Sequence, residues 1–189
     1  MFSGSTILII IVVVIAGYAI VEYNALVRLR QMVQEAWSGI DVQLKRRADL
    51  IPNLLNTVKG YATHESDTFR EVTEMRTRAQ GIPAGDVAGR AAAEGMLSQA
   101  LGKLFAVAEA YPDLKANENY KDLQDSLETI ESEIQMSRRY YNGSARELNI
   151  KVESFPSNII ANAFKFVQAD YFELENAEDR AVPKVDFSK

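Results

Sequence analysis

The chain has 189 residues, of which 47% are hydrophobic, and it carries a formal net charge of −5 at pH 7. It contains no cysteine, which excludes disulfide frameworks, thiolate metal sites, cysteine nucleophiles and a lipid-modified cysteine anchor. The acidic balance argues against nucleic acid as a partner, because such binding relies on basic surfaces. At this length one compact domain is expected beside an apolar N-terminus.

Residues 1–21 contain no charged side chain, and residues 7–21 are nearly all β-branched or small. A helix over residues 3–21 would be about 28 Å long, close to one hydrocarbon thickness. The pattern predicts a transmembrane anchor over residues 1–21. A cleaved signal peptide is the alternative, because Gly17 and Ala19 suit a peptidase, but no Lys or Arg precedes the apolar stretch.

The charges beside the anchor predict its orientation. Arg28 and Arg30 follow the span, whereas only the α-amino group precedes it. The positive-inside rule favours a single-pass protein of the inner membrane with its N-terminus outside and its body cytoplasmic. Membrane lipids are therefore expected partners, and the basic side chains near the span could contact anionic headgroups.

Residues 23–61 have the pattern of one long amphipathic helix that continues the anchor. Its apolar seam comprises Tyr23, Leu26, Val33, Trp37, Ile40, Leu44, Ile51, Leu54, Val58 and Tyr61. Pro52 removes the hydrogen bond to the Ala48 carbonyl, so a kink or a junction is expected there, with Asn53 and Asn56 able to bond freed carbonyls. Beyond Gly60 the pattern persists to about Ala79.

A second helix is expected after the breaker loop at residues 81–85. Asp86 is a suitable N-cap, and the helix should run from Val87 to about Ala110, where Tyr111-Pro112 ends it. Its Ala- and Gly-rich half should pack closely between neighbouring helices or against another subunit.

The third helix is expected to start after Asn117, which can cap it. It has heptad spacing at Tyr120, Leu123, Leu127, Ile130, Ile134, Tyr141 and Leu148. This helix should lie antiparallel to its neighbours and cover the first seam, burying Trp37. Phe155-Pro156 should end it.

The C-terminal part begins with an apolar segment, residues 157–166, which should form a short helix. Together with Tyr171 and Phe172 it holds too many large apolar residues for a free tail. These residues should pack on the end of the bundle or contact a partner or the membrane surface. Residues 173–189 are polar and are expected to be a flexible tail.

Three blocks resemble the LemA family of bacterial membrane-anchored helical proteins. They are WSGIDVQLKRRADLIPNLLNTVKGYATHE at residues 37–65, preceded by Tyr23-Asn24; AVAEAYPDLKAN at residues 106–117; and ESFPSNIIA at residues 153–161, followed by Tyr171-Phe172-Glu173. The resemblance spans almost the whole chain. It implies a helical bundle over residues 22–172, a location in the membrane and a link to membrane stress or envelope proteases. It does not imply a biochemical activity.

No catalytic, cofactor or metal site is expected. His64-Glu65 lacks the second histidine of a zinc-protease motif because residue 68 is threonine, which leaves a hydrolase using His64 the least favoured hypothesis. Arg47 has two interpretations. It belongs either to a salt-bridged surface with Asp41, Lys45 and Asp49, or to a buried pair with an acid of the third helix or of another subunit that sets the register.

The predicted fold is all-α: a transmembrane helix that continues into an antiparallel bundle of three long helices plus a short C-terminal helix. The leading functional hypothesis is a non-enzymatic scaffold that forms homo-oligomers at the membrane and can meet a membrane or envelope protein. The alternative is an adaptor or sensor that binds a peptide, lipid or protein near Trp37 and Pro52. The residues expected to serve assembly or structure are Trp37, Arg47, Asp49, Pro52, Asn53, Tyr111, Pro112, Phe155, Pro156, Ile159, Ile160, Phe164, Tyr171 and Phe172.

Overall fold

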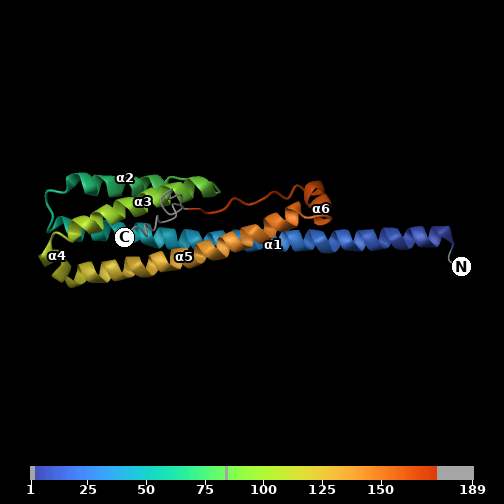
Figure 1. The fold of residues 1–189 in the computed structure, drawn as a ribbon, viewed down its shortest axis with the longest axis horizontal. Coiled ribbons are helices and arrows are strands. Elements are labelled where there is room, and N and C mark those ends of the chain that lie inside the picture. The colour runs from blue at the N-terminus through green and yellow to red at the C-terminus, as the bar shows by residue number, and fades with distance from the viewer. Residues whose placement is uncertain (1–2, 84, 174–189) are drawn as a thin grey trace, which may run out of the picture. The chain divides into compact units, whose positions relative to one another are not determined.

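A computed structural model describes residues 3–83 and 85–173 of the chain. These residues form six α-helices and no β-strand (Figure 1). The helices are α1 (Gly4–Lys59), α2 (Ser66–Gln80), α3 (Val87–Ala108), α4 (Pro112–Ala116), α5 (Glu118–Glu153) and α6 (Ser157–Ala163). The all-α fold class and the helix that continues the apolar N-terminus are confirmed.

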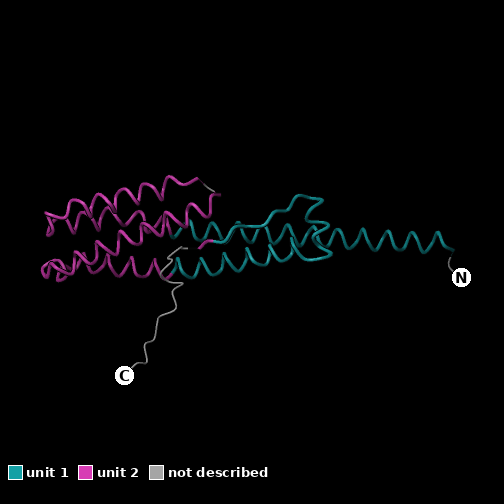
Figure 2. The backbone as a smooth tube through the Cα atoms, turned by 45° about the horizontal axis from the view of Figure 1, so that its top comes forward, with its two compact units in different colours: residues 1–43, 133–171 teal, residues 44–132, 172–189 magenta. Residues whose placement is uncertain are grey.

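The chain divides into two compact units, coloured separately in Figure 2. The first unit comprises residues 1–43 and 133–171, and the second comprises residues 44–132 and 172–189. Helices α1 and α5 each contribute one part to each unit. The predicted division into an anchor over residues 1–21, a bundle over residues 22–172 and a C-terminal tail stays a prediction. The predicted flexible tail, apart from Glu173, lies outside the described residues.

The first unit pairs the N-terminal part of α1 with the C-terminal part of α5. The two helices run antiparallel, since Trp37 contacts Tyr141 while Glu22 lies 2.6 Å from Lys151. Residues 4–21 of α1 are exposed, apart from Ala19, which is half-buried. Among the described residues, α1 is the one helix that is long and apolar enough to cross a membrane.

An extended segment, residues 166–171, returns from α6 along α5. Its backbone needs partners, because a buried amide or carbonyl without a hydrogen bond is costly. Asn149 supplies two of them: its Nδ2 donates to the Ala169 carbonyl at 2.9 Å, and its Oδ1 accepts from the Ala169 amide at 2.8 Å. The Tyr141 hydroxyl donates to the Asp170 carbonyl at 2.8 Å. One face of α5 thus binds an extended segment of the chain.

The second unit contains four longer helical segments, which are residues 44–59 of α1, helix α2, helix α3 and residues 118–132 of α5, together with the short helix α4. Consecutive segments are antiparallel, as shown by the Lys59 ammonium over the Phe69 ring and the Lys103–Glu71 ion pair. Their apolar faces share one core, which includes Ile51, Leu54, Val58, Val72, Leu97, Leu101, Leu104, Leu114 and Tyr120. The short helix α4 connects α3 to α5.

Helix α1 continues through Pro52 and ends at Lys59, so the expected junction lies at residues 60–65 and not at the proline. The apolar pattern that the sequence extends to Ala79 belongs to a separate helix, α2, which folds back on α1. This reversal buries Phe69, Val72 and Ala79 in the core of the second unit. A periodic pattern specifies which residues are buried, but it does not specify whether one helix or two carry them.

The predicted helix caps are present. The Asp86 carboxylate accepts from the Gly89 amide at 2.8 Å at the start of α3, and the Asn117 side chain accepts from the Tyr120 amide at 3.0 Å at the start of α5. Helix α3 ends at Ala108, two residues earlier than expected. Pro112 starts α4, because proline suits the first turn of a helix.

Candidate functional site

The residues expected to serve assembly or structure fall into both units. The first unit contains Trp37, Phe155, Pro156, Ile159, Ile160, Phe164 and Tyr171, and the second contains Arg47, Asp49, Pro52, Asn53, Tyr111, Pro112 and Phe172. The structure therefore does not gather them into one site. Each unit is described separately.

Arg47 is the centre of a buried charge cluster in the second unit. Only 4% of its side chain is exposed, and one terminal nitrogen lies 2.6 Å from a Glu94 carboxylate oxygen. The other terminal nitrogen lies 2.8 Å from Glu131 of α5 and donates to the Ser98 hydroxyl at 2.9 Å. The second carboxylate oxygen of Glu94 accepts from Arg90 Nε at 2.8 Å. Arg47 thus joins α1, α3 and α5.

The cluster satisfies charges that would be costly to bury alone. Glu94 is shared by two arginines, and its side chain is 3% exposed, whereas that of Glu131 is 41% exposed. Among the described residues, Arg47 Nε has no hydrogen-bond partner. The cluster fixes the register of three helices, because a shift of one residue in any of them would separate a buried charge from its partner.

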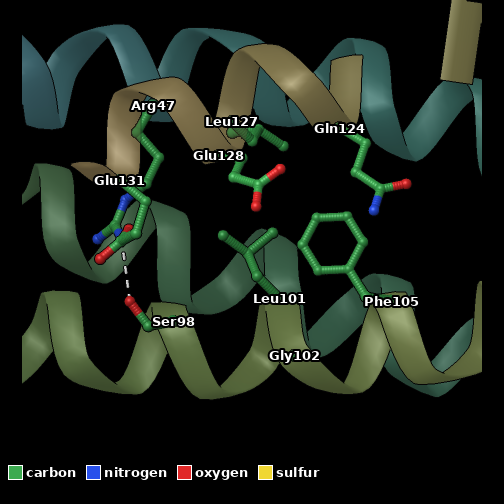
Figure 3. A pocket seen from close by; sticks show the side chains of 9 residues that line it. All are labelled: Arg47, Ser98, Leu101, Gly102, Phe105, Gln124, Leu127, Glu128 and Glu131. Carbon is green, nitrogen blue, oxygen red and sulfur yellow. Dashed lines mark hydrogen bonds and ion pairs between the residues drawn. The ribbon is translucent and has the colours of Figure 1, made fainter. Parts of the chain in front are cut away.

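A groove of about 380 Å³ lies beside this cluster, between α3 and α5. Figure 3 shows Arg47, Ser98 and Glu131 at one end, with Leu101 and Phe105 along the α3 side. Gly102 also lines the groove, and a Cβ atom there would meet no other atom within 4 Å. The groove is mainly apolar with charged groups at its rim, a composition that suits an amphipathic ligand.

Pro52 leaves the carbonyl of Ala48 without its usual intrahelical donor. Arg76 of α2 replaces it, with Nε donating to the Ala48 oxygen at 2.7 Å. Asn53 is exposed, so the donor comes from another helix and not from the neighbouring asparagine. The contact both satisfies α1 and ties α2 to it.

The other predicted residues of the second unit differ in their exposure. Asp49 is exposed and pairs with Lys45 at 3.2 Å. The Tyr111 hydroxyl donates to Glu65 at 3.4 Å, a weak bond that links the turn between α3 and α4 to the turn between α1 and α2. Phe172 is fully buried.

In the first unit, apolar side chains gather where α6 meets the end of the apolar part of α1. The Tyr23 ring lies 4.7 Å from that of Phe164 and 5.8 Å from that of Phe166. A cavity of about 420 Å³ there is lined by Tyr18, Glu22 and Leu29 of α1 together with Ile150, Lys151 and Phe155. The Lys151 ammonium neutralises Glu22, a carboxylate that directly follows the apolar span.

Trp37 is half-buried and packs edge-on against Tyr141, with ring centroids 5.5 Å apart. Burial raises the pKa of the Tyr141 phenol to about 12, and the charge of Asp170 adds to the rise. The neutral phenol is the form that donates to the Asp170 carbonyl. This contact is structural, since it ties the extended segment to α5.

His64 is exposed in the turn between α1 and α2. Within residues 3–83 and 85–173, no group of three or more His, Cys, Asp or Glu side chains could hold a metal ion.

Sequence reasoning did not identify Glu94, Ser98, Arg76 or the Glu22–Lys151 pair. Glu94 could have been noticed as an acid, four residues after Arg90, within an Ala-rich helix of low charge. Arg76 carried no such signal, because its acceptor lies 28 residues away in the chain.

Comparison with known proteins gives a consistent result. A model of the LemA family matches residues 36–187. The chain is 28% identical to two proteins of Paramagnetospirillum magneticum, magnetosome proteins MamQ 1 and MamQ 2, over 90% of its length and 72% of theirs. It is 27% identical to protein LemA of Metamycoplasma hominis over 82% of its length and 70% of that protein.

Proposed function

Because the chain belongs to the LemA family and is a membrane-associated helical protein, we propose that it is a non-enzymatic scaffold that self-assembles at the inner membrane. Residues 4–21 anchor it, with the N-terminus outside and the body in the cytoplasm. The exposed apolar segment of α1 and the basic residues that follow support this placement. Family membership alone does not indicate self-assembly, so that part of the proposal rests on the first unit.

One observation carries the proposal of self-assembly: two large apolar side chains are exposed one helical turn apart on the outward face of α5 in the first unit. Met136 and Tyr140, one helical turn apart, are 51% and 53% exposed, and Gly143 continues the row with open space at its Cβ position. We call these three residues the α5 strip. The spacing of four and three residues is that of a helix–helix seam, and a small residue allows close approach of a partner helix.

The small residues of α3 are used within the chain. Ala91, Ala93, Ala100 and Ala108 are buried in the second unit. They are therefore committed to packing with neighbouring helices, and the α5 strip is the better candidate for contacts between copies.

The test is the oligomeric state of the full-length protein in lipid nanodiscs and in detergent. The double variant Met136→Lys, Tyr140→Glu should be mainly monomeric under conditions in which the wild type is oligomeric. Lys121→Glu, which changes the charge of an exposed residue elsewhere on α5, should assemble as the wild type does. A wild-type protein that stays monomeric at micromolar concentration would refute self-assembly.

The groove between α3 and α5 favours a second candidate, an adaptor that binds an apolar peptide or lipid chain. Gly102→Leu would fill the groove from an open position without disturbing the backbone. Ligands that co-purify with the wild type should be absent from Gly102→Leu, as measured by mass spectrometry, while its oligomeric state stays unchanged. Equal recovery of ligand from both proteins would exclude the groove as the binding site.

A further inference from the structure

The residues around α6 expose large apolar side chains that the fold does not cover. Phe155 is 80% exposed, and Ile159 and Phe164 are each 58% exposed. We call these three residues the α6 patch. Exposed aromatic and branched residues clustered on one segment indicate a contact surface more often than scattered single residues do.

The position of the α6 patch identifies its partner. The Phe164 ring packs against the Tyr23 ring at a tilt of 60°. Tyr23 lies two residues beyond the end of the apolar run at Val21, a rise of about 3 Å along a helix. Phe155 lines a cavity together with Tyr18 and Glu22, on either side of that end. The α6 patch is therefore level with the boundary of the bilayer that α1 would cross, where the headgroup layer lies.

The charges nearby are arranged for the same environment. Glu22 at the boundary is 9% exposed and is paired with Lys151, so the charge of this carboxylate is neutralised next to the apolar span. The exposed basic residues Arg28, Arg30 and Lys165 lie on the segments that carry or contact Tyr23 and Phe164. Basic side chains beside an apolar surface suit anionic headgroups.

From this geometry we propose that the α6 patch docks on the bilayer that holds the anchor, with Phe155, Ile159 and Phe164 in the interfacial layer. The inference rests on the membrane anchoring of the proposed function but not on self-assembly. It assigns a second membrane contact to the chain, about 130 residues after the first in sequence and adjacent to it in the fold. The first unit would then hold to the membrane at two points instead of one.

The test uses single-tryptophan versions of the full-length protein in vesicles of phosphatidylcholine and phosphatidylglycerol. The chain has one tryptophan, so the wild type itself reports on Trp37. Trp37→Phe combined with Phe155→Trp places the reporter in the α6 patch, and Trp37→Phe with Ile159→Trp provides a second, independent reporter. Both replaced positions are exposed, which favours retained folding.

The measurement is fluorescence quenching by lipids brominated on their acyl chains. Tryptophan at position 155 or 159 should be quenched severalfold more than Trp37, and more by bromine near the headgroup than by bromine near the chain end. Trp37 is the matched control, because it lies about 24 Å beyond Val21 along α1.

Two results would overturn the proposal. Emission from both reporters that is insensitive to bromine and typical of water would show that the α6 patch is solvated. Blue-shifted emission that is insensitive to bromine and changes with the protein-to-lipid ratio would show that a second copy covers the patch. The same quenching is expected in the Met136→Lys, Tyr140→Glu background, so failure of self-assembly would leave this inference standing.

Discussion

Arg47 shows how much of this protein depends on a single buried charge. Its guanidinium contacts Glu94, Ser98 and Glu131 from two other helices. Removing one member of a buried ion pair leaves the other uncompensated, which usually costs more than the pair contributes. The pairing therefore specifies the arrangement of α1, α3 and α5 more than it adds to net stability.

We expect Glu94→Gln to lower the free energy of unfolding by about 3–5 kcal/mol, because Arg47 and Arg90 lose their shared carboxylate. The matched control is Asp49→Asn, which removes an exposed pair with Lys45 and should cost less than about 1 kcal/mol. Denaturant unfolding in detergent, followed by circular dichroism, measures both. Equal losses would show that burial of the cluster has no energetic consequence.

The raised pKa of Tyr141 predicts that the stability of the folded protein falls at alkaline pH. Its pKa of about 12 in the folded protein lies above the usual value near 10. The folded state therefore keeps a proton that the unfolded state loses, and the contribution of Tyr141 is complete below pH about 10 and is lost as the pH rises towards 12. Tyr141→Phe should be less stable by about 1 kcal/mol at neutral pH.

The measurement for Tyr141 is the difference in unfolding free energy between wild type and Tyr141→Phe across this pH range. That difference should shrink as the phenol of the folded wild type ionises, whereas other titrating groups affect both proteins alike. A difference that stays constant up to pH about 12 would contradict the assigned pKa.

At the scale of elements, the continuity of α1 through Pro52 depends on α2. The Ala48 carbonyl, freed by the proline, accepts from Arg76. An isolated helix with this sequence would be expected to bend or end near the proline. The packing of a neighbouring helix thus completes the hydrogen bonding that α1 lacks by itself.

A double-mutant cycle tests this coupling. Arg76→Met should destabilise the protein by about 1–3 kcal/mol, because a partly buried carbonyl loses its donor. In the Pro52→Ala background the residue 52 amide can bond the Ala48 carbonyl, so the same Arg76→Met change should cost less, with a coupling of about 0.5–1.5 kcal/mol. Independent, additive effects in chemical denaturation would indicate that Arg76 acts through packing alone.

At the scale of the whole molecule, the compact units are assembled from segments far apart in the sequence. The first joins residues 1–43 to residues 133–171, and the anchor belongs to it. The proposed contacts with the membrane and with other copies, the α6 patch and the α5 strip, both lie in this unit. The second unit holds the buried charge cluster and the groove.

Orientation in the membrane can be tested on a chain that has no cysteine. Ser66→Cys, at the exposed start of α2, should react with an impermeant maleimide in inverted inner-membrane vesicles but not in right-side-out vesicles. Ser3→Cys, before the span, should show the reverse pattern. The expectation follows from the positive-inside rule applied to Arg28 and Arg30, which follow the span in the sequence, and a reversed result for both variants would place the body outside.

The sequence alone determined the features that depend on local patterns. The apolar run marks the anchor, heptad spacing marks the seam of α5, and Asp86 and Asn117 mark where two helices begin. These features can be predicted because the apolar pattern of a helix repeats every few residues, and a capping side chain bonds an amide only two or three residues away. The helical class and most buried apolar positions follow from them.

Only the tertiary structure decided which distant residues meet. It folds α2 back after Lys59, pairs Arg47 with Glu94, brings Arg76 to the Ala48 carbonyl and divides α1 and α5 between two units. Each of these outcomes depends on which of several possible contacts between residues tens of positions apart has the lowest free energy. The periodic pattern of the sequence is the same for all of these possible contacts, so it does not distinguish them. Burial and charge pairing in three dimensions select among them.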